Sequence, residues 1–135
     1  MEQNFGRETW SVQIPEGWTG QHDPECATIV GDRDVGALQI SVAFKDTVVF
    51  DTDLREFAEE HLEAGAKTRS VQLGDFVGFA IAFSKEDSFW KHWYLRNGKQ
   101  ALLVTYICSL GDRGVEDAAV NMILSTLSVS GVGEG

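Results

Sequence analysis

Large apolar side chains alternate with polar ones along much of this chain, which is the pattern of β-strands that bury one face. Residues 10–14 alternate in this way, and Pro15 ends the predicted strand. Residues 26–30 predict a second strand and residues 37–44 a third. The third is expected to bury Leu38, Ile40, Val42 and Phe44 and to direct Gln39 and Ser41 to the other side. Residues 15–20, with one proline and two glycines, are expected to form a loop.

Two segments carry apolar residues at helical spacing instead. In the first, Asp53 and Glu56 fit a capping box, and Gly65 predicts the end of the helix. Its apolar stripe is Leu54, Phe57, Ala58, His61 and Leu62, with His61 at the edge. The second helix is predicted over residues 115–127. Its apolar stripe is Val115, Ala118, Ala119, Met122, Ile123 and Thr126.

Four further strands are predicted to form a meander, in which each strand pairs with the next. They are residues 67–73, 76–84, 89–96 and 99–110. Asn97-Gly98 is the strongest turn signal, because this dipeptide favours a two-residue type I′ hairpin, and Gly74-Asp75 is a second turn. A two-residue turn at Asn97-Gly98 also fixes the register. The expected pairs are Trp93 with Leu102, Tyr94 with Ala101 and Trp90 with Thr105.

The order of elements is therefore β-β-β-α-β-β-β-β-α. Hairpin-linked strands with helices outside a βαβ alternation indicate an α+β protein. We expect a twisted antiparallel sheet of about six or seven strands flanked by two helices. The whole chain, residues 1–135, is predicted to be one domain, with a body over residues 9–129 and a flexible tail over residues 130–135.

Both faces of the predicted meander are apolar. If Ser84 lies opposite Phe89, one face carries a row of small residues beside large ones and the other face carries several aromatic rings. The first face holds Gly78, Ala80 and Ala82 opposite Leu95, Trp93 and Lys91. The second holds Val77, Phe79, Ile81 and Phe83 beside Trp90, His92 and Tyr94. Either the rings fill a two-sided core, or the second face is a partly exposed protein-binding cleft with Trp90 exposed.

Charge narrows the choice of partner. The chain has 135 residues, with 21 acidic and 11 basic side chains and a net charge of −10. This balance argues against nucleic acids and against anionic membrane surfaces. Six carboxylates lie between Asp51 and Glu63. They are typical of a solvated helix face, and the alternative is a docking surface for a basic protein through Glu59, Glu60 and Glu63.

No motif for catalysis or cofactor binding occurs in the sequence. Gly-x-Ser-x-Gly, HExxH, a phosphate loop and an EF-hand loop are all missing, so no cofactor or metal is expected. His22 precedes Cys26 by four residues in a proline-containing loop, which is a poor metal-ligand pair. Cys108 and His92 lie on neighbouring predicted strands, where they are either two core-lining side chains or a nucleophile and its base.

The N-terminal residues show no secretory signal, and no apolar run is long enough to span a membrane. We therefore expect a cytoplasmic protein whose two cysteines are buried thiols.

Residues 10–18, which read as a strand followed by Pro-x-Gly-Trp, resemble the opening of PsbP-like domains. Residues 36–41, the helix from Leu54, residues 74–79 and the closing Ser125-Thr126-Leu127 follow the same order, so the resemblance covers residues 9–129. That superfamily includes the PsbP subunit of photosystem II, a Ran-binding nuclear import factor, DcrB-like bacterial proteins and chaperones for type VI secretion effectors. The resemblance implies an antiparallel sheet flanked by helices that binds proteins, without a shared enzymatic activity or transferable site residues.

The sequence thus favours a non-catalytic, bacterial-type protein-binding domain, an adaptor or a chaperone that holds an apolar segment against its sheet. Trp90, His92 and Tyr94 are the expected contact residues. One alternative is an immunity-type inhibitor that neutralises a basic toxin through its acidic surface. Another is a small hydrolase or ligand-binding domain with a pocket near His92. The oligomeric state and the identity of the partner do not follow from the sequence.

Overall fold

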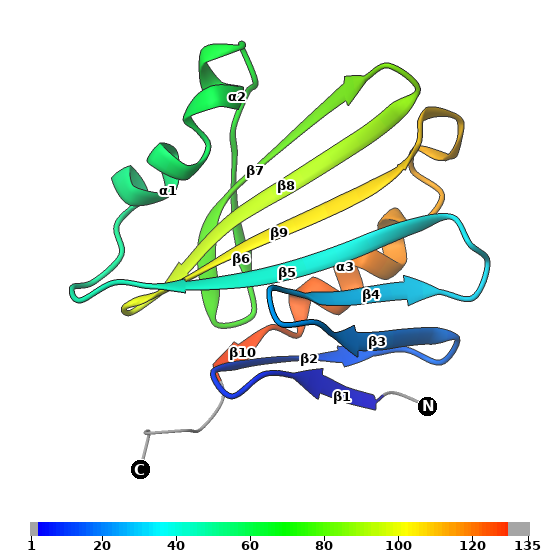
Figure 1. Ribbon diagram of the computed structural model, residues 1–135, viewed down its shortest axis with the longest axis horizontal. Helices are drawn as coiled ribbons and strands as arrows, with labels where there is room; N and C mark the ends of the chain where they lie inside the picture. Colours follow the sequence, from blue (N-terminus) through cyan, green and yellow to red (C-terminus); the bar gives the residue numbers. More distant parts are fainter. Residues whose placement is uncertain (1–2, 130–135) are drawn as a thin grey trace.

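The computed structural model describes residues 3–129, which form a large and a small antiparallel sheet with three α-helices (Figure 1). The large sheet has the strand order β3-β4-β5-β9-β8-β7-β6. Its strands are β3 (Trp18–His22), β4 (Ala27–Gly31), β5 (Gly36–Phe44), β6 (Arg69–Leu73), β7 (Phe76–Lys85), β8 (Ser88–Asn97) and β9 (Gln100–Ser109). The small sheet consists of β1 (Gln3–Gly6), β2 (Trp10–Ile14) and β10 (Ser128–Val129). The helices are α1 (Asp51–Phe57), α2 (Glu59–Glu63) and α3 (Asp117–Ser125), and a 3-10 turn, η1 (Leu110–Asp112), follows β9.

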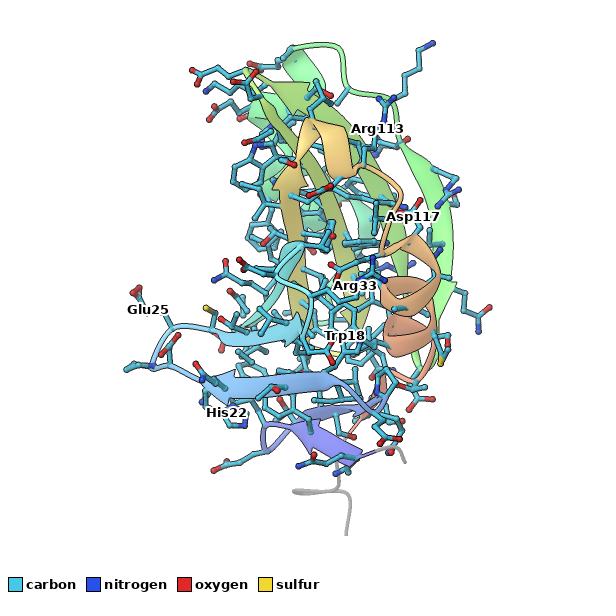
Figure 2. The ribbon with its side chains drawn as sticks, turned by 90° about the vertical axis from the view of Figure 1, so that its right-hand side faces the viewer. Trp18, His22, Glu25, Arg33, Arg113 and Asp117 are labelled. Atoms are coloured by element: carbon cyan, nitrogen blue, oxygen red, sulfur yellow. The ribbon has the colours of Figure 1, made fainter. Side chains whose placement is uncertain are left out.

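The two faces of the large sheet are covered to different extents. On one side α3 and β2 complete the larger core, and Figure 2 shows α3 alongside this face, with Asp117 at its start. On the other side α1 and α2 cover only one end of the sheet, and Leu54 and Ala58 pack there on Phe79, Ile81 and Tyr94. Figure 1 looks onto this second face, with α1 and α2 at the upper left, while α3 passes behind β5. The sequence-based prediction of an α+β protein with a sheet of about seven strands is confirmed.

The helix predicted from residue 54 is divided into two. Ala58 ends α1 and precedes α2, with φ −96° and ψ 5°. Phe50 is the N-cap of α1, and its backbone N–H donates to the Asp53 carboxylate at 2.8 Å, so Asp53 caps backwards rather than pairing with Glu56. A hydrogen bond from Lys45 at 2.6 Å, together with the one from Phe50, lowers the pKa of Asp53.

The predicted buried stripe of α3 is correct at Ile123 and wrong for most of its other members. The side chains that enter the core are Val120, Ile123, Leu124 and Leu127, whereas Val115 and Met122 are about half exposed. This set repeats at i, i+3, i+4 and i+7 as well as the predicted one does, and it contains larger side chains. The hydrogen bond from the Tyr106 hydroxyl to Glu116 Oε1, at 2.7 Å, ties the residue before α3 to the sheet and sets which face of the helix is buried.

The register of the β8–β9 hairpin differs from the prediction by two positions. Asn97 pairs with Gln100, so the turn residues are Gly98 and Lys99, and only Gly98 has a positive φ, of 59°. The observed pairs are Trp93 with Val104, Tyr94 with Leu103 and Trp90 with Ile107. A shift by two keeps every side chain on its predicted face, because side chains alternate with a period of two. Pairing across the β7–β8 turn agrees with the prediction, with Ser84 opposite Phe89.

The N-terminal region contains more strand than expected. Residues 15–20 were predicted as a loop, but β3 begins at Trp18, whose N–H donates to the carbonyl of Pro15 at 3.1 Å. Strands β1 and β10 had no sequence prediction, and they pair with the two edges of β2. At the far end of β5, Val42 and Phe44 are exposed rather than buried, since the strand extends past the core there. The predicted tail, residues 130–135, lies outside the described residues.

Candidate functional site

The uncovered part of the second sheet face is the candidate site, and we call it the open face. It consists of three cross-strand rows that run from β8 through β9 to β5, and two of them continue to β4. The rows are Trp90–Ile107–Ala37–Val30, His92–Thr105–Gln39–Thr28 and Tyr94–Leu103–Ser41. Tyr94, at the β8 end of the third row, is itself buried beneath the helices. The pairing register assigns all of these side chains to one side, because directly paired residues share a face.

The open face exposes apolar side chains to solvent. Val30 is 36% exposed and Leu103 38%, and Trp90 and Ile107 are partly exposed. On the opposite side of the same strand, Trp93 is only 2% exposed beneath the larger core. The two indole rings of β8 therefore have different environments, as the alternation of side chains predicts.

No residue of the three rows carries a formal charge, although the chain holds 21 acidic and 11 basic residues. Along β8, the next residue on this face after Tyr94 is Arg96, which lies at the margin of the open face. Arg96 pairs with Asp51 at 2.8 Å. A surface without charges at the centre of a strongly charged protein matches the composition of the central part of protein interfaces.

A cluster of aromatic rings joins α2 to the open face. His61 stacks on Phe83 with ring centroids 4.7 Å apart and meets His92 edge-on at 5.0 Å. His92 in turn packs edge-on against Trp90 at 6.0 Å, and its Nδ1 lies 3.1 Å from the Tyr94 hydroxyl. The cluster packs against one side of Trp90, and on the other side Trp90 is paired with Ile107 of β9.

Burial keeps His92 and Tyr94 neutral around pH 7. It lowers the pKa of His92 to about 4, and the neighbouring His61 adds to the effect. It also raises the pKa of Tyr94 to about 12. Both shifts have the same cause, since removing a side chain from water disfavours its charged form. The open face therefore lacks ionised groups throughout the physiological pH range.

One end of the open face is hollowed. The hollow has a volume of about 650 Å³, and its lining includes the apolar side chains of Val30, Ala37 and Ile107. Asp32, Asp34 and Asp87, from two loops, also line it. The hollow therefore combines apolar surface with carboxylates.

The structure brings together the predicted residues Trp90, His92 and Tyr94, although Tyr94 is buried beneath the helices. The other predicted group, Glu59, Glu60 and Glu63, is exposed on α2 and does not belong to the rows of the open face. Sequence reasoning missed the members from β9, β5 and β4. Their alternation was visible in the sequence, but the pairing of β5 with β9 was not.

The nucleophile–base pair that the sequence allowed for Cys108 and His92 is not formed. His92 lies on the open face, whereas Cys108 lies on the opposite face, where burial raises the pKa of its thiol. Among residues 3–129 no group of three or more His, Cys, Asp and Glu is arranged to hold a metal ion. Cys26 is partly buried, and neither thiol of the described chain forms a disulfide. No described helix combines the length and apolarity needed to cross a bilayer.

No family model and no curated protein matches this sequence. Solved structures that share its architecture include the following three. A chain from Bacteroides thetaiotaomicron is 16% identical with a TM-score of 0.64, and the match covers 93% of this chain and 46% of that one. LpqN, involved in cell envelope biogenesis of Mycobacterium tuberculosis, is 13% identical with a TM-score of 0.65, over 97% of this chain and 91% of LpqN. Cyanobacterial PsbP (CyanoP) from Synechocystis sp. PCC 6803 is 11% identical with a TM-score of 0.63, over 95% and 92%.

These likenesses concern the fold, because every identity is low. The chain is an α+β protein built on an antiparallel sheet with helices on both faces. Within that class it has the PsbP-like fold, as its opening strand-Pro-x-Gly-Trp pattern indicated. It spans about half the length of the Bacteroides thetaiotaomicron chain and nearly all of the other two.

Proposed function

We propose that this chain is a non-catalytic protein-binding domain, an adaptor or a chaperone, that takes an apolar segment of a partner protein on the open face. The observation that carries the proposal is the set of three uncharged cross-strand rows on a chain of net charge −10. The solved relatives support the fold on which this face is built, and their names specify no partner for this chain.

Trp90 is the expected anchor of the interface. Buried aromatic anchors dominate the binding energy of interfaces, and a ring that is already held in place loses little entropy on binding. The aromatic cluster around His92 supplies that support. Beyond Trp90, the hollow lined by Ile107, Ala37 and Val30 accommodates further apolar side chains of the same segment.

The carboxylates that line the hollow narrow the expected chemistry of the bound segment. Asp32, Asp34 and Asp87 favour a basic residue at the end of the bound segment that lies over the hollow. The expected ligand is therefore an apolar stretch of a protein with a lysine or arginine beside it. We expect this binding in the cytoplasm, which remains a prediction from the sequence.

The test combines site-directed cross-linking with a charge placed on the open face. A photo-reactive residue at position 105 is used to capture partners in the source cells, and mass spectrometry maps the peptide that it labels. Leu103→Asp should abolish the capture, because it buries an unpaired carboxylate under the ligand. Met122→Asp on α3 is the matched control, since Met122 is 49% exposed and belongs to the opposite side of the molecule.

The expected result is one labelled protein whose labelled peptide is apolar, retained by Met122→Asp and lost with Leu103→Asp. Circular dichroism and melting curves confirm that both variants fold. The proposal fails if Leu103→Asp keeps the partner, or if the labelled peptide is uniformly charged.

A further inference from the structure

The free edge of β7 is a second surface, separate from the open face. β6 pairs with β7 only as far as Arg69 opposite Ala80, so residues 81–85 of β7 have β8 on one side and no strand of the described chain on the other. Figure 1 shows β7 continuing beyond β6 while the connection from α2 to β6 diverges from it. Exposed strand edges of this kind can pair with an added strand.

The two turns that flank β7 show which backbone groups point out of this edge. Leu73 and Phe76 flank a two-residue turn and therefore form a hydrogen-bonded pair, so the backbone N–H and C=O of Phe76 point toward β6. Because backbone groups alternate in direction along a strand, those of all even-numbered β7 residues point to the same side. Lys85 and Ser88 flank the next two-residue turn, which independently directs the odd-numbered residues toward β8. Beyond Ala80, the N–H and C=O groups of Ala82 and Ser84 therefore point away from the sheet. Both side chains are small and exposed.

A cavity of about 830 Å³ lies along this edge. The β7 residues 80–85 form one wall, and residues 64–67, after α2, form the other. Its basic lining residues are Lys67, Arg69, Lys85 and Lys91, against the single carboxylate of Glu60. The cavity therefore has the opposite sign to the chain as a whole, whose net charge is −10.

None of these basic groups forms an ion pair within the described part of the chain. Among residues 3–129 no carboxylate lies within 4.0 Å of any of the four, whereas Lys45 and Arg96 elsewhere are paired. The Lys91 ammonium lies 5.1 Å from the centre of the Trp93 ring. Burial and the nearby charge of Arg69 lower the pKa of Lys91, and the Asp117 carboxylate partly opposes this shift.

We propose that the free edge of β7 binds an extended acidic segment of another protein by strand addition. The segment occupies the position that a longer β6 would fill, between β7 and residues 64–67. Residues opposite Ala82 and Ser84 share the face of Lys91 and Arg69 and are acidic. The residue opposite Phe83 turns to the other face, toward His61 and Ala66, and is apolar. The recognised pattern is acidic–apolar–acidic.

Charge selects this occupant over a second copy of the chain. Edge-to-edge pairing of two copies would bring the same four cations against each other, which costs free energy in either strand direction. The inference goes beyond the proposed function, because the open face lies across β8 and β9 and the two surfaces can be disabled separately.

The probe is a capped synthetic peptide, Glu-Val-Asp-Val-Glu, whose binding is followed by calorimetry at low salt. Two comparison peptides replace the acidic residues with lysine, or N-methylate the backbone so that strand pairing is blocked. Lys67→Glu with Arg69→Glu, both at exposed positions that line the cavity, should weaken binding of the acidic peptide about tenfold or more, since 1.4 kcal/mol is a factor of about ten. Lys99→Glu with Arg113→Glu, which changes net charge equally at exposed positions outside the cavity, should change it less than about twofold.

Ala82→Pro removes one outward N–H and should therefore abolish binding of the peptide. The variant is expected to fold, because proline is tolerated at sheet edges. Should Ala82→Pro fail to fold, N-methylation of the peptide tests the same hydrogen bonds from the other side. Equal binding of the lysine peptide or of the N-methylated peptide overturns the inference, and so does a dimer in sedimentation that Ala82→Pro disrupts. Leu103→Asp should leave peptide binding unchanged, so failure here is distinguishable from failure of the open face.

Discussion

Tyr106 and Glu116 show how one hydrogen bond can position a helix. The Tyr106 hydroxyl donates to Glu116 Oε1 at 2.7 Å, and Glu116 is only 9% exposed just before α3 begins. Burial and the adjacent carboxylate raise the pKa of Tyr106 far above its usual value, so the hydroxyl remains a donor at any physiological pH. The hydrogen bond from Tyr106 offsets the free-energy cost of removing the Glu116 carboxylate from water. Without this donor the buried carboxylate would destabilise the fold.

Tyr106→Phe should therefore destabilise the fold by about 1–3 kcal/mol, measured by urea unfolding. The control is the same substitution in a Glu116→Ala background, where the carboxylate is no longer present. The loss should be clearly smaller there. Equal losses in both backgrounds would show that ring packing, rather than the hydrogen bond, explains the effect.

His92 gives the fold a specific pH dependence. Its pKa in the folded protein is about 4, below the value of about 6.5 for an unfolded histidine. Protonation therefore favours the unfolded chain, so the contribution of His92 is complete above pH 6.5 and is lost progressively as the pH falls toward about 4. In His92→Phe, the free energy of unfolding should decline less steeply than in the wild type between about pH 6.5 and 5, where most carboxylates stay ionised. Parallel curves over that interval would contradict the assignment.

At the scale of elements, the turn between β8 and β9 decides the register of the central hairpin. Gly98 has a φ of 59°, whereas Asn97 belongs to β8 and has no positive φ. The Asn97 side chain instead donates to the carbonyl of Asp75 at 2.8 Å. An Asn-Gly pair is consistent with either register, and the sequence alone favoured the wrong one.

Gly98→Val should destabilise the fold by at least about 1 kcal/mol, because a β-branched residue is strained at positive φ. Asn97→Thr is the matched substitution, and it should cost less, since it removes only one exposed hydrogen bond. Thermal unfolding of both variants measures the difference. A larger loss for Asn97→Thr would instead support the type I′ turn that the sequence suggested.

Most strands could be predicted because alternation is a local property. The residues of β2 and the faces of β7 and β8 were correct, and the faces of β9 survived a two-position register error. The buried stripe of α3 was not predictable in the same way, because two stripes of similar spacing compete and the Tyr106–Glu116 contact selects one. The candidate site was predicted only on β8, since the rows of the open face depend on the non-local pairing of β5 with β9.

The molecule as a whole has two cores of unequal size on the two sides of one sheet. Trp93 belongs to the larger core and Trp90 to the margin of the smaller one, so they are natural probes of the two sides. Trp93→Ala should cost about 3–5 kcal/mol of stability in urea unfolding, as large-to-small core substitutions do. Trp90→Ala should cost clearly less and, if the open face binds as proposed, should weaken binding by about 2 kcal/mol or more. Equal, large losses of stability would mean that the open face is not an available surface.

The strand order of the large sheet also dictates an order of assembly during folding. β6, β7, β8 and β9 pair strictly with their sequence neighbours, so this meander closes only short loops. The β5–β9 pairing, by contrast, must bring Phe44 to Gln100 across the intervening helices and meander, and β10 reaches β2 from the other end of the chain. Long-range closures of this kind slow folding. The meander is therefore expected to form first, and a nascent chain cannot complete either core until β9 has been synthesised, because β9 contributes side chains to both.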